Sequence, residues 1–476
     1  MVENKRGIFI STISQSAGRI LGLVFALASV KLLTNYLGVV GTGEYNTITT
    51  YLNFFVVIAD LGLFSVTVRE ISKKPEQEKK ILANVFYVRL ITALIASIIA
   101  GAIVFLTKYN DHIKIGTLIA LGFLFFNLVW SIFDIVFQYR LKMQYSAIAE
   151  FLGKFVMLVA LFLVIRNHGS FYWVVSTISI SALAGFLIKW YFSGKFIKFH
   201  PEYDHKVASW IVKAAIPLGA VFIVNNLFFK IDTLMLFMIK GAAAVGIYSV
   251  AYKVLEVTIF AGSYFASSLK PTLSQNMDVD NKSVKKLINK SFSVMLLISF
   301  PIAIICTVFS KEIIIFLSNS DFVSGSKALV FLGFTLPLIY LDVLLGEILI
   351  AKDARKLLIN IAIFILILNV VLNLILIPIF SFIGAAIVTL ISELVLFLVN
   401  YYYTKKILGY EINWNTILKI LLISALTLFF GLMIKVLAVN FLILIALTLL
   451  AYAALAFVFK LVSLGTIKDL AKEGQE

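Results

Sequence analysis

Apolar stretches of roughly 20 residues, each long enough to cross a hydrocarbon core of about 30 Å as a helix, follow one another along the whole chain. A bilayer core offers no water to backbone N–H and C=O groups, so such stretches must form helices. Of the 476 residues 61% are apolar, and the mean hydropathy is +1.02, values that the core of a soluble protein could not absorb. The sequence therefore predicts an all-α integral membrane protein.

We expect about 14 transmembrane helices, joined by loops too short to hold an extramembrane domain. The predicted spans are residues 8–34, 46–68, 81–106, 115–138, 146–166, 171–193, 209–238, 247–268, 288–310, 326–350, 357–378, 382–403, 416–436 and 439–462. The single cysteine, Cys306, lies within an apolar run, where it packs as a small hydrophobic residue and cannot form an internal disulfide.

The loops alternate between many and few basic residues, which predicts the orientation of the chain. If Lys5 and Arg6 face the cytoplasm, the loops on that side carry Arg69, Lys73, Lys74, Lys79, Lys80, Arg140, Lys142, Lys195, Lys198, Lys206, Lys270, Lys282, Lys285, Lys286, Lys352, Arg355, Lys356, Lys405 and Lys406. The opposite loops carry chiefly Lys108, Lys114, Arg166, Lys240, Lys311, Lys327 and Lys435. This bias predicts a protein of the cell membrane with both termini in the cytoplasm. The net charge of +16 is dispersed rather than gathered in one basic stripe, which argues against nucleic acid as a partner.

A short pattern recurs between the two halves of the chain. Its members are Gly38, Gly43 and Tyr45 after the first span and Gly241, Gly246 and Tyr248 after the seventh, at a constant offset of 241 − 38 = 203. A second pair, Asp134 and Asp342, has an offset of 342 − 134 = 208. The alternative is a chance match among the glycines that are common in membrane helices.

A repeat at these positions predicts two pseudo-symmetric six-helix lobes, because six spans return the chain to its starting side. The lobes would be related by an axis along the membrane normal, with a substrate site between them at mid-membrane. The predicted divisions are 1–206 for the first lobe, 207–406 for the second, and 407–476 for two additional helices and a short cytoplasmic tail.

The sequence carries no familiar catalytic motif. It has neither a GxxxxGKS or GxxxxGKT phosphate-binding loop nor an HExxH motif, and all four histidines lie in predicted loops. We therefore expect no catalytic residue, no metal site and no cofactor. A transporter without a nucleotide site must run down a gradient, either of its substrate or of a coupled ion such as H⁺ or Na⁺.

Arg19 is an ionisable residue about midway along the first span, where a charge is costly. Gly18 and Gly22 flank it and thin the helix surface, and Gln15 lies one turn away. An arginine suits a phosphate because its planar fork donates two parallel hydrogen bonds and stays ionised. The alternative is an internal ion pair with Asp60 in the second span.

The seventh and eighth spans also carry polar residues at depths in the membrane where a polar or charged side chain is costly. They are Asn225, Asn226, Lys230 and Asp232 in the seventh span and Lys253 and Glu256 in the eighth. We expect the carboxylates to form ion pairs across the helices, and Lys230 and Lys253 to contact an anion in the outward half of a cavity. The substrate-cavity candidates are thus Gln15, Arg19, Asn225, Asn226, Lys230 and Lys253.

Asp342 in the tenth span and Glu393 in the twelfth have no evident partner in sequence. Either could bind a proton or a sodium ion, and either could instead serve as a packing residue that hydrogen-bonds between helices. The candidates for ion coupling or ion pairing are Asp60, Asp232, Glu256, Asp342 and Glu393.

Several short stretches resemble a known family. They are residues 37–45 (LGVVGTGEY), 230–232 (KID), 241–249 (GAAAVGIYS), 377–378 (IP), 384–386 (GAA) and 392–393 (SE). With these motifs the chain resembles the Wzx-type oligosaccharide flippases of the multidrug/oligosaccharidyl-lipid/polysaccharide exporter superfamily, over essentially its whole length.

The resemblance implies a V-shaped pair of six-helix bundles and transport by alternating access. It implies that the partner is a glycan linked to a polyprenyl pyrophosphate, such as undecaprenyl or dolichyl pyrophosphate, within membrane lipid. Members often carry arginine where Lys230 stands, so the charge persists here without the bidentate fork. We expect a monomer.

Two other functions fit parts of the pattern. A cation-coupled multidrug exporter of the same superfamily would favour an acidic cavity in its first lobe, whereas the first span here offers Arg19 and no carboxylate. A membrane-embedded sugar polymerase or glycosyltransferase would carry a long outward loop rich in acids, histidines or arginines, which this chain lacks. Flippases of peptidoglycan precursors are close relatives of the favoured class.

The lysine asymmetry makes the topology testable with single cysteines. After Cys306→Ser, a membrane-impermeant thiol reagent applied to intact cells should label a cysteine placed near Lys311 and spare one placed near Lys74. Permeabilised cells should show labelling at both positions. The reverse pattern in intact cells would contradict the predicted orientation.

Overall fold

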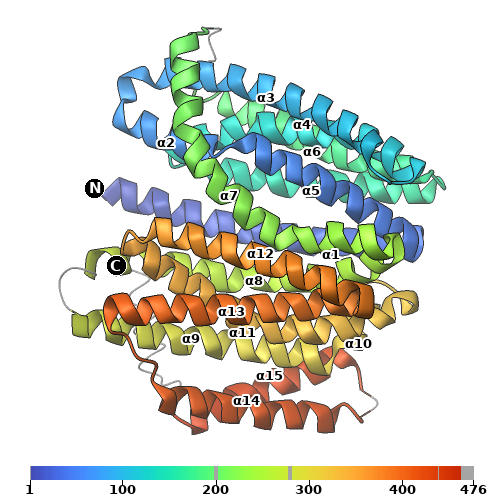
Figure 1. Cartoon of the computed structure of the whole chain (residues 1–476), viewed down its shortest axis with the longest axis vertical. Helices are drawn as coiled ribbons and strands as arrows, with labels where there is room; N and C mark the ends of the chain where they lie inside the picture. Colours follow the sequence, from blue (N-terminus) through green and yellow to red (C-terminus); the bar gives the residue numbers. More distant parts are fainter. Residues whose placement is uncertain (1, 198–201, 277–280, 438, 462–476) are drawn as a thin grey trace. The chain divides into compact units, whose positions relative to one another are not determined.

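The structure, a computed structural model, is helical wherever it is regular over the residues that it describes, 2–197, 202–276, 281–437 and 439–461 (Figure 1). Its α-helices are α1 (Val2–Asp60), α2 (Leu63–Lys73), α3 (Glu78–Leu106), α4 (Asp111–Tyr139), α5 (Gln144–Arg166), α6 (Phe171–Ser193), α7 (His205–Lys240), α8 (Ala242–Asn276), α9 (Asn281–Val308), α10 (Ser310–Leu317), α11 (Ser326–Ala351), α12 (Arg355–Phe380), α13 (Phe382–Leu408), α14 (Trp414–Ile434) and α15 (Phe441–Val458). Short 3₁₀ turns cover Pro75–Gln77 and Ser320–Gly325. The predicted all-α class is confirmed.

Twelve segments among the described residues are long and apolar enough to cross a membrane. One of them, Gly22–Lys73, is 52 residues long and holds the end of the first predicted span and the whole of the second. These segments make the chain a multi-pass membrane protein, and the total of about 14 crossings stays a prediction.

The first repeat pattern is visible in the backbone. Gly38 interrupts α1 with φ 63° and ψ −170°, and Gly241 separates α7 from α8 with φ 80° and ψ −175°. This conformation is essentially restricted to glycine. The loop expected at 35–45 is therefore only a kink at Gly38, after which the helix continues to Asp60.

The second glycines of the pattern allow two backbones to touch. A Cβ added at Gly43 would lie 1.8 Å from the Ala242 carbonyl oxygen, and one at Gly246 would lie 2.0 Å from the Val39 carbonyl oxygen. No side chain fits at either position, so both glycines serve the same packing role.

The loops that follow α4 and α11 give the register of the repeat in these two helices. The helices end at Tyr139 and Ala351, and the chain then turns at Leu141 (φ 54°) and Asp353 (φ 55°). The helix ends are 351 − 139 = 212 residues apart in sequence, and the turn residues are also 353 − 141 = 212 apart. Asp134 lies 139 − 134 = 5 residues before its helix end, whereas Asp342 lies 351 − 342 = 9 residues before its own. The two aspartates are thus one helical turn out of register, on the same helix face.

The chain divides into two compact units. Unit 1 comprises Met1–Gly246 and Leu317–Asp321, and unit 2 comprises Ile247–Phe316 and Phe322–Glu476. In unit 1, α4 packs most extensively against α6, and α1 against α5. In unit 2, α11 packs against α13 and α9, while α14 and α15 cover another part of α9. The predicted lobe boundaries at 206 and 406 are drawn from the sequence repeat, whereas these two units are defined by packing. The boundaries therefore stay predictions.

Candidate functional site

A helix break inside an apolar segment marks the candidate site in unit 1. The span expected at 46–68 is not one helix, because α1 ends at Asp60 and α2 begins at Leu63. Leu61 (φ 49°) and Gly62 (φ 71°) carry the break, and the Gly62 N–H donates to Asp60 Oδ2 at 3.2 Å. Gly219 of α7 approaches so closely that an added Cβ would lie 2.5 Å from the Leu61 carbonyl group.

Arg89 of α3 satisfies the broken end of α1. Its Nη2 donates to Asp60 Oδ1 at 2.6 Å, and its Nη1 is 3.4 Å from the Asp60 carbonyl oxygen. The Arg89 side chain is fully buried, whereas the Asp60 side chain is 32% exposed. One arginine thus neutralises a carboxylate and caps a free carbonyl where water is scarce.

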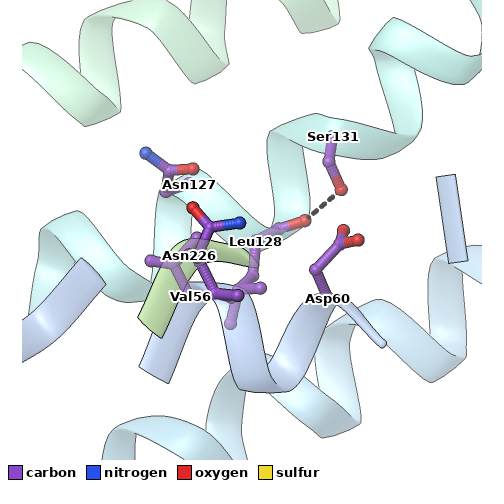
Figure 2. A pocket seen from close by; sticks show the side chains of 7 residues that line it. Val56, Asp60, Asn127, Leu128, Ser131 and Asn226 are labelled. Carbon is purple, nitrogen blue, oxygen red and sulfur yellow. Dashed lines mark hydrogen bonds between the residues drawn. The ribbon is translucent and has the colours of Figure 1, made fainter. Parts of the chain in front are cut away.

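The exposed edge of Asp60 faces a cavity of about 200 Å³ (Figure 2). Its lining consists of Val56, Val57 and Asp60 from α1, Asn127, Leu128 and Ser131 from α4, and Asn226 from α7. Figure 2 shows the amides of Asn127 and Asn226 on one side and Ser131 and Asp60 on the other. Ser131 Oγ donates to the Leu128 carbonyl at 2.7 Å, and Asn127 makes no side-chain hydrogen bond within the described part of the chain.

A second buried ion pair lies one turn further along α4. Lys189 of α6 is only 1% exposed, and its Nζ lies 2.8 Å from Asp134 Oδ2 and 3.9 Å from Glu150 Oε1. Ser146 Oγ donates to Asp134 Oδ1 at 2.6 Å, and the ammonium sits 4.4 Å from the centre of the Trp130 ring. The interior carboxylates Asp60 and Asp134 are therefore each paired with a buried cation.

The start of α7 is fixed from the loop before it. Asp204 caps the helix by accepting from the Lys206 N–H at 2.9 Å, and its backbone N–H donates to Asn84 Oδ1 at 2.7 Å. Lys80 Nζ lies 2.7 Å from Asp204 Oδ2, and this hydrogen bond lowers the pKa of Asp204. These contacts anchor the helix that carries Asn226.

The structure brings only some of the predicted site residues into this cavity. Asp60 and Asn226 line it, and the side chains of Gln15, Arg19 and Asn225 lie outside the described residues. In the alternative, in which Arg19 pairs with Asp60, the Asp60 carboxylate would have to be shared with Arg89, which already pairs with it.

The remaining candidates lie elsewhere in their units. In unit 1, Lys230 is half-buried, and Asp232, 3% exposed, accepts from the Thr233 N–H at 2.6 Å. In unit 2, Lys253 pairs with Glu256 on the same helix at 2.8 Å.

Asp342 and Glu393, the last two candidates, are buried in unit 2 at 7% and 2% exposure. Asn400 Nδ2 donates to Asp342 Oδ1 at 3.0 Å.

Sequence reasoning missed Arg89 and Lys189. Both are ionisable residues within predicted spans, at 81–106 and 171–193, so the criterion that selected Arg19 also finds them. It missed Asn127 and Ser131 because uncharged polar residues are common in membrane helices as packing contacts.

Two family models match the chain. The model described as "Polysaccharide biosynthesis protein" matches residues 5–277, which is more than half of the chain, and the model described as "MatE" matches residues 217–375.

Curated proteins are similar over various lengths. "Probable low-salt glycan biosynthesis flippase Agl15" of Haloferax volcanii is 27% identical over 38% of this chain and 40% of its own length. "Capsular polysaccharide biosynthesis protein CapF" of Staphylococcus aureus is 25% identical over 48% of this chain and 59% of its own. The chain thus spans less than two thirds of both. "Uncharacterized membrane protein MJ1068" of Methanocaldococcus jannaschii is 23% identical over 82% of each chain.

Solved structures share the fold. "Lipid II flippase MurJ, inward closed conformation" superposes with a TM-score of 0.80 at 19% identity, covering 94% of this chain and 98% of that one. An inward-facing multidrug resistance MATE family transporter gives a TM-score of 0.65 at 12% identity, over 83% and 98%.

The Arg89–Asp60 pair should carry stability that a surface pair does not. Arg89→Gln leaves the Asp60 carboxylate without its cation and should cost about 3 kcal/mol, whereas Arg140→Gln, which removes an exposed pair with Glu78, should cost roughly 0–1 kcal/mol. Adding Asp60→Asn to Arg89→Gln should recover part of the loss. Unfolding of the purified variants in detergent measures the three effects, and equal losses for the two arginines would contradict the assignment.

Proposed function

The chain belongs to the family of polysaccharide biosynthesis proteins, and we propose that it is a flippase that moves a lipid-linked oligosaccharide across the cytoplasmic membrane by alternating access. The proposed cargo is a glycan on a polyprenyl pyrophosphate, used to build a surface polysaccharide. The names of the Haloferax volcanii and Staphylococcus aureus relatives support a glycan as cargo.

The chemistry of the unit 1 cavity carries the proposal. Its polar groups are two amides, a hydroxyl and a carboxylate that already holds an arginine. Amides both donate and accept hydrogen bonds, as sugar hydroxyls do. An exporter of cationic drugs needs an uncompensated negative charge, and Arg89 removes that charge from Asp60.

The pyrophosphate requires a different group. It must shed water to enter the membrane, so a fixed cation has to replace its hydration. We assign this role to Arg19, with Lys230 and Lys253 as further cations along the path. The proposed orientation keeps both termini in the cytoplasm, where the lysine-rich loops lie.

A transporter rather than an enzyme fits the same features. The polar groups of the cavity include no nucleophile with an adjacent general base, and the sequence has no nucleotide-binding motif. The gradient of the substrate or of an ion would drive the cycle.

Arg19 should act through its charge. Arg19→Ala should lower flipping of lipid-linked oligosaccharide by about 10-fold or more, Arg19→Lys should keep partial activity, and Arg19→Glu should abolish transport at normal membrane levels. Arg166→Ala, which removes a cation at the end of α5, serves as the control and should leave transport unchanged. Flipping by purified protein in liposomes provides the measurement. If Arg19 only balances Asp60, the double variant Arg19→Ala with Asp60→Ala should instead transport at the parental rate.

Transport should not depend on nucleotide. Purified protein in sealed liposomes should flip its substrate down a concentration gradient equally well with and without ATP. A requirement for added ATP would rule out a secondary transporter, whereas transport of a cationic dye in place of the lipid-linked glycan would favour the multidrug exporter.

A further inference from the structure

Corresponding helix pairs in the two units hold their buried acids in different ways. The pairs are α4 with α6 in unit 1 and α11 with α13 in unit 2, each heavily packed within its own unit. Lys189 lies 189 − 171 = 18 residues after the start of α6, and Asn400 lies 400 − 382 = 18 residues after the start of α13. Lysine in one repeat is therefore replaced by asparagine in the other.

In unit 1 the lysine is a fixed cation. Its ammonium contacts Asp134 at 2.8 Å from a position that is 1% exposed. The protein thus supplies a positive partner for this buried carboxylate.

In unit 2 no lysine or arginine within the described residues pairs with Asp342. The Asn400 amide reaches Asp342 Oδ1 at 3.0 Å but carries no charge. Glu393 lies two turns before Asn400 on the same face of α13, the helix that packs against α11, and its charge acts on the Asp342 carboxyl. Both acids and Asn400 are at most 7% exposed.

Two buried polar atoms of this cluster lack a partner. Within the described part of the chain, Asp342 Oδ2 and Asn400 Oδ1 have no hydrogen-bond partner, although both are shielded from solvent. An unsatisfied buried oxygen is costly, and two ionised carboxylates in contact repel each other strongly at low dielectric. A proton on one carboxyl removes the repulsion and donates a hydrogen bond to the other carboxyl.

Other charged groups nearby do not supply the missing positive charge. The ionisable residues with described side chains on the helices packed around α11 and α13 are Tyr248, Tyr252, Lys253 and Glu256 on α8, Lys285, Lys286, Lys290 and Cys306 on α9, Lys356 on α12, Tyr401, Tyr402, Tyr403, Lys405 and Lys406 on α13, and Lys327, Tyr340 and Glu347 on α11 itself. None of the lysines with described side chains forms an ion pair with Asp342 or Glu393.

We propose that Asp342, Glu393 and Asn400 form a site inside unit 2 that binds one exchangeable proton. One proton suffices to remove the repulsion between the two carboxyl groups, and binding of a metal ion such as sodium is the alternative that the experiment distinguishes. The site binds an ion and not the cargo, so an experiment that contradicts it would leave the proposed function untouched, and the reverse also holds.

Infrared difference spectroscopy of the full chain in bilayers tests the site without any transport assay. The parental protein should show the C=O absorption of one protonated carboxyl group, which disappears as the pH is raised. Asp342→Asn with Glu393→Gln should lack this signal. Glu411→Gln, which removes an acid paired with Lys405 at the surface, should retain it.

A second variant copies the arrangement of unit 1. Asn400→Lys places an ammonium beside Asp342, and the protonated-carboxyl signal at neutral pH should be lost because the cation takes the place of the proton. Since a buried lysine can disturb folding, the single variants Asp342→Asn and Glu393→Gln, each expected to shift the titration midpoint, keep the test informative.

Two results would overturn the proposal. The first is an unchanged carboxyl signal in the folded double variant. The second is a titration midpoint that shifts when sodium replaces choline at constant ionic strength, because the pair would then bind a metal ion. An unchanged midpoint supports a proton as the only ion bound.

Discussion

The absence of water from the hydrocarbon core governs the whole structure. A helix satisfies its own backbone, so a break in a helix needs partners from elsewhere in the protein. Unit 1 places such a break at Leu61 and Gly62, and Arg89 supplies hydrogen bonds to both the carboxylate and the carbonyl of Asp60. The cavity between α1, α4 and α7 lies beside this broken end, with Asp60 in its lining. The ion pair that the membrane requires at this break thus also borders the polar site.

The repeat shows which features are held in common and which have diverged. Gly38 and Gly241 adopt the same backbone conformation, and Gly43 and Gly246 both permit direct contact between backbones. Backbone geometry leaves no choice at these positions, because any Cβ would collide. Side chains between helices face a weaker constraint, which is only that each buried polar group be satisfied. A fixed ammonium and an exchangeable proton are two solutions to that constraint, and the two units use one each.

The sequence predicts the class of this protein well, because the length and apolarity of each span are local properties. The repeated pattern at Gly38 and Gly241 is likewise visible in the sequence, but the positive φ of these glycines is seen only in the structure. The break at Leu61 does not, since a leucine beside one glycine continues an apolar run without a signal. Arg89 is visible as a mid-span cation, but its partner Asp60 lies 29 residues away, and spacing alone cannot select it among several acids. By contrast, the Lys253–Glu256 pair is three residues apart on one helix, where spacing brings the side chains together.

The division of charge between the units has a consequence for how an ion can act. Asp60 and Asp134 are held by an arginine and a lysine, so the protein itself supplies the positive charge that balances these two carboxylates of unit 1. A proton that binds between Asp342 and Glu393 changes the charge of unit 2 by one. Ligand binding can shift an equilibrium between two conformations only by its difference in affinity for them. Under the proposed function, a proton bound in unit 2 and a cargo bound in the cavity of unit 1 would occupy separate places, which would divide the two tasks of a coupled transporter between the two halves of one chain.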